Sequence, residues 1–305
     1  MVSVVGAGIW GRVLFQLIKK GNWETVITSR NFRPMEGFVE WERAIENPYL
    51  IIAVASQGVG EVLQKLKGWK GKGILIASKG IERHSLKFMH QIATQFLPEK
   101  QVAFLGGPSF AKEVAEGKPT GLVVASKNLQ LAEQFRNFLD APFLKIYLST
   151  DLAGVEVAGA YKNVLAIAGG ICEGLELGQN AKASLLGRGL VEMARFGKVF
   201  GGEVETFLGL AGAGDLFLTA NSSLSRNFRV GYNLAKGRQL PEILSELGEV
   251  AEGVYTAEAI YRLAQLHRVY TPIATQIYQI LYHQKPIISA LQTLLSSDSY
   301  PKSFT

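Results

Sequence analysis

The most constraining feature of the sequence is a glycine pattern close to its N-terminus. Gly6, Gly8 and Gly11 form a G-x-G-x-x-G pattern, which follows a β-branched run at residues 2–5 and opens a helical pattern at residues 9–20. In this arrangement the first glycine permits a tight turn, the second lets the backbone approach a pyrophosphate, and the third permits close packing of helix on strand. The helix N-terminus also attracts negative charge. The pattern therefore predicts a dinucleotide-binding βαβ unit at the start of the chain.

The first half of the chain alternates between short apolar runs and helical periodicity. Helical patterns fall at residues 9–20, 59–67, 84–97 and 129–139. Apolar runs without strict alternation, joined by helices, indicate a parallel sheet covered on both faces. We therefore predict an α/β Rossmann fold with a doubly wound, mostly parallel sheet. Its expected strands are residues 2–5, 25–28, 49–54, 73–78, 102–106, 121–126 and 143–148.

The second half has a different character, because strand-like runs disappear after about residue 150. At about 150 residues per domain, a chain of 305 residues suggests two domains. We predict an NAD(P)-binding Rossmann domain at residues 1–149, an all-helical domain at residues 150–305, and a cleft between them. Helical periodicity in the second domain falls at residues 151–175, 182–200, 203–209, 226–235, 241–246, 255–267 and 271–282.

Composition excludes several classes of protein. Apolar residues make up 48% and charged residues 19% of the chain, so it can bury enough surface to fold. No stretch of about 18–20 residues is apolar without a charge or a glycine-rich break, which argues against a membrane span. The single cysteine, Cys172, excludes a disulfide framework and a cysteine-rich zinc site, and we interpret it as a packed thiol. No basic segment precedes the first apolar run, as it would in a signal peptide, and the four histidines are scattered without metal-ligand spacing. We therefore expect a cytoplasmic protein without a metal site.

The charge of the chain points to an anionic partner without naming it. With 32 basic and 26 acidic side chains the net charge is +6, which suits nucleic acid, an anionic membrane or anionic small molecules. The densest basic stretch, residues 65–72, is interrupted by glycines and a tryptophan. Such a stretch is more typical of a solvated loop than of a nucleic-acid-binding patch. We therefore expect no nucleic acid partner.

A basic residue occupies the position that contacts the adenosine ribose in a dinucleotide-binding fold. The second expected strand ends at Ser29-Arg30, 24 residues beyond Gly6, where NAD-preferring folds usually place an acidic residue. A guanidinium can pair with a 2′-phosphate, and Arg33 follows closely. Arg30 therefore favours NADP(H), and NAD(H) is the alternative cofactor. Arg30 could also be a solvated loop residue that contacts no cofactor.

Two later segments are too polar or too glycine-rich to be ordinary core. In the first, Gly107 precedes Ser109, which can contact a ligand or cap the next helix. In the second, Lys162 interrupts an apolar helical run, so its ammonium either reaches solvent or points into a cleft. In a dry cleft, desolvation lowers the pKa of a lysine from about 10.4 and suits it to donate a proton.

A third polar segment follows a glycine-rich turn. Asp215 comes directly after the turn at residues 209–214, and Ser225, Arg226 and Asn227 lie a short distance beyond it. The charged and neutral donors of Arg226 and Asn227 suit a phosphate group. A loop turn followed by a solvated helix start gives the same pattern, and residue type alone leaves both interpretations open.

Together and in order, these segments resemble the bacterial-type NAD(P)-dependent glycerol-3-phosphate dehydrogenases. The similarity extends from Val2 to about Leu295. It rests on GAGxWG at 6–11, SKG at 78–80, GPSFAKEVA at 107–115, YKNVLAIAGGICEGLELGQNAKASLLGRGLVEM at 161–193, GLAGAGDLFLT at 209–219, SRN at 225–227 and EGVYTAEAI at 252–260.

The resemblance implies a homodimeric enzyme that transfers hydride reversibly between NAD(P)H and dihydroxyacetone phosphate, giving sn-glycerol 3-phosphate for glycerophospholipid synthesis. Lys162 matches the family's proton donor and acceptor, and we expect Asn163 and Asp215 to orient its ammonium. The substrate-contacting positions correspond to Lys79, Gly107, Ser109, Lys162, Asp215, Ser225, Arg226 and Asn227. The cofactor-binding positions, added to Gly6, Gly8 and Gly11, correspond to Trp10, Arg30, Lys79, Ala111, Arg226, Val250 and Glu252.

The chain also departs from the family pattern. Ile9 stands where a serine is common, and Arg12 stands where a small residue is usual. The stretch between Arg30 and the strand at 49–54 is roughly 20 residues shorter than in a usual Rossmann half, as if a helix and a loop beside the adenosine site were trimmed.

Two other functions compete with this one. Arg226 can hold a carboxylate as well as a phosphate, so a reductase of similar architecture could act on a β-hydroxyacid, a ketopantoate-like acid or a cyclic imine. A non-catalytic NADP(H) sensor could use the same Rossmann domain to report redox state to a partner. Such a sensor would tolerate changes at Lys162 and Asp215.

Overall fold

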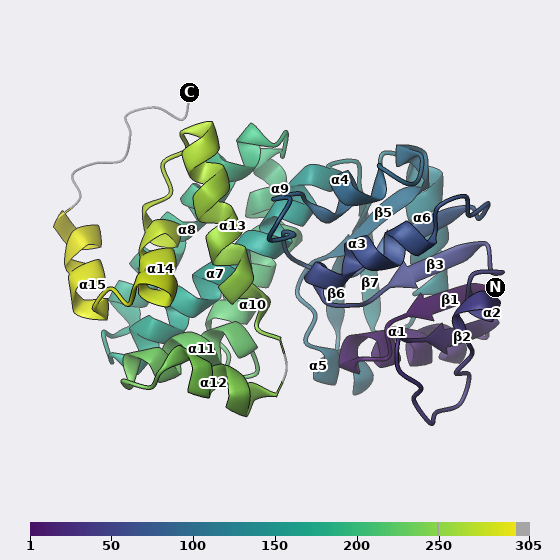
Figure 1. The fold of residues 1–305 in the computed structure, drawn as a ribbon, viewed down its shortest axis with the longest axis horizontal. Coiled ribbons are helices and arrows are strands. Elements are labelled where there is room, and N and C mark those ends of the chain that lie inside the picture. Colours follow the sequence, from purple (N-terminus) through teal and green to yellow (C-terminus); the bar gives the residue numbers. More distant parts are fainter. Residues whose placement is uncertain (249, 297–305) are drawn as a thin grey trace.

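The computed structural model describes residues 1–248 and 250–296. Within these residues seven strands form one sheet in the order β2-β1-β3-β4-β5-β6-β7, on the right in Figure 1. The strands are β1 (Val2–Val5), β2 (Thr25–Thr28), β3 (Tyr49–Ile52), β4 (Gly73–Ile76), β5 (Val102–Gly106), β6 (Thr120–Ala125) and β7 (Leu144–Ser149). All seven expected strands are present, and β3 and β4 each end two residues earlier than expected.

The sheet is mostly parallel, as predicted. Strands β1 to β5 are parallel, β6 runs antiparallel to β5, and β7 is parallel to β6. The strand order reverses at β1, which has β2 on one side and β3 on the other. Ligands of open α/β sheets bind outside the carboxyl ends of the strands at such a reversal. Gly6 directly follows β1 and Ala53 directly follows β3, so the glycine pattern lies at this place.

Helices cover both faces of the sheet. Apolar residues of α1 and α6, including Phe15 and Phe135, pack with Leu75 on one face, and Val59 of α3 packs with Phe104 on the other. The helices of this half are α1 (Ile9–Lys20), α2 (Trp41–Ala44), α3 (Ser56–Lys65), α4 (Met89–Ala93), the 3-10 turn η1 (Glu99–Gln101), α5 (Ala111–Ala115) and α6 (Leu129–Phe138). Between Arg30 and β3, the short segment contains one helix, the four-residue α2.

The prediction of a helix at residues 84–97 is wrong over most of that range. Only α4 (Met89–Ala93) is helical there. Ahead of it, the carboxylate of Glu82 accepts the backbone N–H groups of His84 and Ser85, and Leu86 has a φ of 58°. These local hydrogen bonds satisfy the backbone in a turn, and a side chain that binds nearby backbone competes with helix formation.

All described elements after β7 are helical, which confirms the all-helical second half on the left in Figure 1. They are α7 (Leu152–Gly174), α8 (Gln179–Val199), α9 (Val204–Leu208), the π-helical turn η2 (Leu210–Gly214), α10 (Asp215–Ala220), α11 (Arg226–Ala235), α12 (Leu240–Leu247), α13 (Glu252–His267), α14 (Pro272–His283) and α15 (Ile287–Ser296). Three of these elements, η2, α10 and α15, were not predicted from the sequence. Residues 297–305 of the expected helical domain lie outside the described residues.

Helix α7 forms the centre of the helical half. Among the described residues it alone has the length and apolar composition of a membrane span, and its apolar window is entirely buried inside the protein. Helix α11 crosses it very closely: a Cβ on Gly170 would lie 2.0 Å from the carbonyl oxygen of Phe228, and one on Gly231 would lie 1.9 Å from that of Ile167. This crossing brings the N-terminal end of α11 against the middle of α7.

The two halves share an apolar contact. Val155 of α7 and Ala211 of the η2 turn belong to the core cluster that covers one face of the sheet. Gly106 at the end of β5 permits this approach, because a Cβ there would lie 2.4 Å from Cγ1 of Val155. The helical half is therefore packed directly on the sheet, near the carboxyl ends of its strands.

Candidate active site

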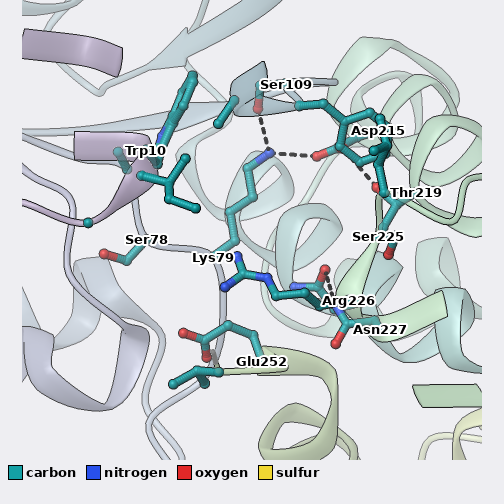
Figure 2. Close-up of a pocket in the computed structure, with 18 of the residues that line it drawn as sticks. Trp10, Ser78, Lys79, Ser109, Asp215, Thr219, Ser225, Arg226, Asn227 and Glu252 are labelled. Carbon is teal, nitrogen blue, oxygen red and sulfur yellow. Dashed lines mark hydrogen bonds and ion pairs between the residues drawn. The ribbon is translucent and has the colours of Figure 1, made fainter. Parts of the chain in front are cut away.

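A cavity of about 610 Å³ lies between the sheet and the helical half, and both halves line it (Figure 2). It contains twelve of the sixteen residues that the sequence analysis assigned to cofactor, substrate or catalysis. These twelve are Gly8, Trp10, Lys79, Ser109, Ala111, Lys162, Asp215, Ser225, Arg226, Asn227, Val250 and Glu252. Residues from seven separate stretches of sequence thus meet in one place.

The three glycines of the N-terminal pattern have different physical roles. A Cβ on Gly6 would lie 2.4 Å from the carbonyl oxygen of Ala53, and one on Gly11 would lie 1.8 Å from that of Gly6. The fold itself therefore requires these two glycines. Gly8 has a φ of −72°, which any residue adopts, and a Cβ there would meet no protein atom within 4 Å. The open space at Gly8 faces the cavity and suits the close approach of a dinucleotide pyrophosphate.

A lysine–aspartate–lysine cluster forms the polar centre of the cavity. Lys162 Nζ donates to Asp215 Oδ1 at 2.8 Å and to Thr219 Oγ1 at 2.8 Å. From the other half of the molecule, Lys79 Nζ donates to Asp215 Oδ2 at 2.7 Å and to the carbonyl oxygen of Gly107 at 2.8 Å. Figure 2 shows Lys79 extending toward Ser109 and Asp215. One carboxylate therefore holds two ammonium groups from the two halves.

Burial and charge tune the acidity of this cluster. Burial lowers the pKa of Lys162 to about 8; Asp215 opposes the decrease, while the charges of Lys79 and Arg226 add to it. Burial disfavours the carboxylate of Asp215, but the ammonium groups of Lys162 and Lys79 outweigh it and hold its pKa below the ordinary value. Lys162 is therefore an acid that can exchange a proton near neutral pH.

The local fold explains how Lys162 and Asp215 meet. Lys162 lies in the middle of the buried helix α7, with its side chain on the cavity side. Asp215 begins α10 directly after the wide turn η2, and a Cβ on Gly212 of that turn would lie 2.0 Å from the carbonyl oxygen of Phe207. Single π-helical turns are rare and are frequently found at functional sites. The glycine-rich stretch at residues 209–214 thus turns the chain so that Asp215 faces α7.

The first turn of α11 forms the opposite wall. Ser225 caps this helix by accepting the N–H of Phe228 at 3.2 Å. Asn227 Nδ2 donates to Asn163 Oδ1 at 2.9 Å, and Asn227 Oδ1 accepts the N–H of Gly253 at 2.9 Å. These bonds tie α11 to α7 and α13, and they leave Arg226 at a capped helix N-terminus on the cavity wall (Figure 2). A helix N-terminus with an adjacent arginine is suited to an anion.

Glu252, on the wall of the cavity, joins the two halves. Its carboxylate accepts the N–H of Ser56 at 2.9 Å and the hydroxyl of the same serine, at the start of α3. Burial raises the pKa of Glu252, while Ser56 and the charge of Arg226 oppose the increase. The contact was not foreseen, because Ser56 and Glu252 are 196 residues apart in the sequence.

Four predicted site residues do not line the cavity. Gly6 and Gly11 lie behind it, where they shape the turn. Gly107 contributes its carbonyl oxygen to Lys79 from outside the lining. Arg30 is exposed after the end of β2 and is separate from the cavity wall. The expected contact of Arg30 with a 2′-phosphate therefore stays a prediction.

Two expectations about side-chain partners are wrong. Asn163 does not orient the ammonium of Lys162; its amide donates to the carbonyl oxygen of Gly159 at 3.2 Å and accepts from Asn227. Thr219, one helical turn after Asp215, holds the ammonium instead. Ser109 does not cap α5, whose N-cap is Phe110; its hydroxyl lies near Gly107 and Lys79. The i, i+4 spacing of Asp215 and Thr219 was the signal that could have identified Thr219.

Two further cations line the cavity and were not predicted from the sequence, Lys112 and Arg229. Arg229 lies three residues after Arg226 and so shares a face of α11 with it. With these two, the lining carries five cationic side chains against the carboxylates of Asp215 and Glu252. This excess of positive charge suits ligands that carry phosphate.

A Rossmann sheet whose glycine-rich turn faces a buried, acidic lysine from a helical half defines a nicotinamide-dinucleotide-dependent dehydrogenase. The chain belongs to the NAD-dependent glycerol-3-phosphate dehydrogenase family. The model of the family's N-terminal region matches residues 38–132, and that of its C-terminal region matches residues 151–292.

Individual relatives agree with the family assignment. The chain is 49% identical over 293 residues to glycerol-3-phosphate dehydrogenase [NAD(P)+] from Nitratiruptor sp., covering 96% of this chain and 97% of the relative. It is 50% identical over 297 residues to the protein of the same name from Sulfurimonas denitrificans, with 97% and 99% covered. The crystal structure of glycerol-3-phosphate dehydrogenase from Coxiella burnetii is similar with a TM-score of 0.90 and 32% identity, covering 97% of this chain and 98% of that one.

Proposed function

We propose that this chain is a glycerol-3-phosphate dehydrogenase that interconverts dihydroxyacetone phosphate and sn-glycerol 3-phosphate with NAD(P)H or NAD(P)+, and that Lys162 is its proton donor and acceptor. Family membership supports the activity, since relatives about half identical over nearly the whole chain carry this name. The observation that carries the catalytic role is the buried Lys162–Asp215 pair on the wall of the cavity behind the glycine pattern.

The proposed mechanism follows from what the residues can do. NAD(P)H, when bound, supplies the hydride that reduces the ketone carbon. The carbonyl oxygen of the substrate then becomes an alkoxide and needs a proton. Lys162, with a pKa lowered to about 8 by burial, donates that proton from Nζ and removes it in the reverse direction. Asp215 and Thr219 hold the ammonium in place, so that its direction is fixed before the substrate arrives.

We assign the phosphate of the substrate to the first turn of α11. Arg226 supplies a guanidinium, Asn227 an amide, and the capped helix N-terminus a favourable dipole. Lys79 extends across the cavity and adds a second charge near the reacting end. Holding the phosphate end ties down the part of the substrate that does not react, so that the carbonyl meets the hydride donor and Lys162 together.

The proposed cofactor site uses the first turn of α1. Gly8 leaves room for the pyrophosphate, and Trp10, Ala111, Val250 and Glu252 line the same side of the cavity. Use of NAD(P) follows from the family. We further propose that Arg30 favours NADP(H). Arg30 lies shortly after the end of β2, and β2 pairs with β1, the strand that leads into the glycine pattern.

The preference is tested by comparing kcat/KM for NADPH and NADH in the wild-type protein and in R30A. Loss of one charged contact to the 2′-phosphate lowers kcat/KM for NADPH about tenfold and leaves NADH unchanged. Arg136, on α6, provides the control variant R136Q. A wild-type preference for NADH, or an equal loss with both cofactors, contradicts the assignment.

The activity is tested by following NADPH and NADH oxidation with dihydroxyacetone phosphate and with ketones that carry a carboxylate instead. The proposal predicts turnover with the phosphate substrate and little with the carboxylates. Preference for a carboxylate ketone would support the alternative reductase, and cofactor binding without any turnover would support the sensor. Neither alternative is favoured by the relatives at about half identity.

Three further expectations stay predictions. The chain is expected to form a homodimer, to act in the cytoplasm, and to have its domain boundary between residues 149 and 150. The change from strands to helices between β7 and α7 supports the domain boundary. The first two rest on the family resemblance and on composition, and gel filtration with light scattering tests the dimer.

A further inference from the structure

The segment that brings Lys79 into the cavity has little regular structure of its own. Residues 77–88, which we name the Lys79 segment, connect β4 to α4 and contain only the isolated bridge between Ile81 and Phe88. Its far end is a turn closed by hydrogen bonds of Glu82 to its own neighbours. The position of Lys79 therefore depends on what holds this segment from outside.

The helical half holds the segment through Arg83, four residues beyond Lys79. Arg83 Nε donates to Glu258 Oε2 at 2.6 Å, and the guanidinium lies 5.9 Å from the ring centres of both Tyr255 and Tyr282. The carbonyl oxygen of Arg83 accepts from Arg262 at 3.3 Å. The side chain of Arg83 is thus held by α13 and α14. Its carbonyl oxygen is held by α13, and its N–H donates to Gln57 Oε1 of α3 at 2.9 Å.

The contacts from α13 fall on one face of that helix. Glu252 holds Ser56 of α3, Tyr255 and Glu258 contact Arg83, and Arg262 reaches its carbonyl oxygen. Intervals of three or four residues place these side chains in one row. The buried face of α13 carries Val254 and Ala257, and the N–H of Gly253 binds Asn227 in the site. One helix therefore contacts both the Lys79 segment and the wall that carries Arg226 and Asn227.

We propose that Arg83 and Glu258 are a positioning pair, which holds the Lys79 segment so that the ammonium of Lys79 stays against Asp215. The inference rests on the proposed function. The charge of Lys79 is one of the causes that lower the pKa of Lys162, so a Lys79 that leaves Asp215 makes Lys162 a weaker acid. Neither Arg83 nor Glu258 lines the cavity, so any effect of the pair on the site is indirect.

A merely structural ion pair makes a different prediction. The side chains of Arg83 and Glu258 are 40% and 18% exposed, and pairs this accessible contribute little to global stability. A matched control is the pair of Arg136 and Glu133 on α6, joined at 2.7 Å with side chains 39% and 53% exposed and away from the cavity. The variants to compare are R83Q, E258A, the double variant R83Q/E258A, and R136Q.

Two readouts decide the proposal. The first is the pH dependence of kcat/KM for the reduction of dihydroxyacetone phosphate. The second needs no turnover: the rate at which acetic anhydride acetylates Lys162 in the full-length protein, followed across pH by mass spectrometry, reports the ionisation of Lys162. We expect R83Q and E258A to lower kcat about tenfold and to move the midpoint for Lys162 upward by about half a pH unit or more. The effect of the double variant should fall well short of the sum of the single effects, since each single variant already removes the Arg83–Glu258 interaction, and R136Q should match the wild type.

Three results would overturn the proposal. One is an acetylation midpoint in R83Q and E258A equal to that in R136Q. Another is a midpoint that moves downward, and a third is a double variant whose effects are the sum of the single ones. A wild-type protein without turnover would contradict the proposed function instead, and the acetylation profile would still test the positioning pair. Thermal midpoints equal to that of R136Q show that the variants are folded.

Discussion

Lys162 and Asp215 lie 53 residues apart in the sequence and form a buried ion pair, with Nζ and Oδ1 separated by 2.8 Å. Lys162 is 8% exposed and Asp215 only 1%. Burial alone disfavours both charges, but each charge stabilises the other. Lys79 adds a second cation to Asp215, so that the cluster carries a net positive charge, which suits an alkoxide and a phosphate.

The pH dependence of the reaction follows from this pair. Lys162 must be protonated to donate a proton, and its pKa is lowered to about 8, chiefly by burial. We therefore expect kcat/KM for reduction to fall as the pH rises through about 8, and kcat/KM for oxidation to rise over the same range. Steady-state rates between pH 6 and pH 10 in both directions check this. If kcat/KM changes in the same direction with pH for both reactions, Lys162 is not the group that exchanges the proton.

Removing the charge of Asp215 should change both acidity and stability. Asp215 opposes the decrease in the pKa of Lys162, so D215N moves the upper limb of the reduction profile to lower pH. We expect kcat to fall about 100-fold or more, because the ammonium loses its partner. Leaving the buried Lys162 and the partly buried Lys79 without their carboxylate costs about 3–5 kcal/mol in the free energy of unfolding, measured with urea. An upper limb that moves to higher pH would show that Asp215 does not hold Lys162 charged.

The glycine pattern offers a test that separates folding from cofactor binding. G6A and G11A place a Cβ against backbone oxygen atoms, so both variants should unfold at lower temperature than the wild type. G8A meets no protein atom and keeps an ordinary φ, so it should melt near the wild type. Its Cβ occupies the space assigned to the pyrophosphate, and we expect its Kd for NAD(P)H to rise about tenfold or more. Fluorescence titration measures this, and wild-type affinity in G8A would contradict the assignment.

A second buried carboxylate, Glu192, should make stability depend on pH without affecting the reaction directly. It accepts the N–H groups of Ile273 and Ala274 and the hydroxyl of Tyr161. Burial raises its pKa to about 7, although these donors oppose the increase. Since the folded protein holds this proton more tightly than the unfolded chain, the contribution of Glu192 to the free energy of unfolding is greatest below about 4.5, decreases between about 4.5 and 7, and is constant above 7.

E192Q removes this titration. Relative to E192Q, the wild-type free energy of unfolding should fall by about 3 kcal/mol as the pH rises from about 4.5 to 7. Urea unfolding at several pH values measures the difference between the two proteins. A difference that is independent of pH, or one that increases with pH, would show that Glu192 is ionised throughout this range.

Much of the fold could be predicted because local sequence encodes it. The buried strands are continuous apolar runs, and the fold itself requires Gly6 and Gly11, so sequence and structure agree there. Lys162 could be identified because the ammonium of a lysine in a helix of small apolar residues must either reach solvent or point into a cleft. Its acidity could not be predicted, since it depends on Asp215 and Lys79 from distant parts of the chain.

Side-chain partners across elements were the least predictable. Asn163 lies next to Lys162 in sequence, but the close crossing of α7 and α11 gives it Asn227 as its partner. The prediction of a helix at residues 84–97 was wrong because the carboxylate of Glu82 accepts the backbone N–H groups of His84 and Ser85. Hydrophobic periodicity does not reveal such a bond. The contact of Glu252 with Ser56 depends on the packing of the two halves, which apolar patterning does not specify.

Proton transfer by Lys162 can be tested by comparing two lysine variants. K162M keeps the length of the side chain and removes its charge, while K127M makes the same change at an exposed lysine. With dihydroxyacetone phosphate and NAD(P)H we predict that K162M loses about 100- to 10,000-fold in kcat and keeps the KM for the cofactor. K127M should retain wild-type kcat. A K162M protein that turns over at the wild-type rate would contradict the account.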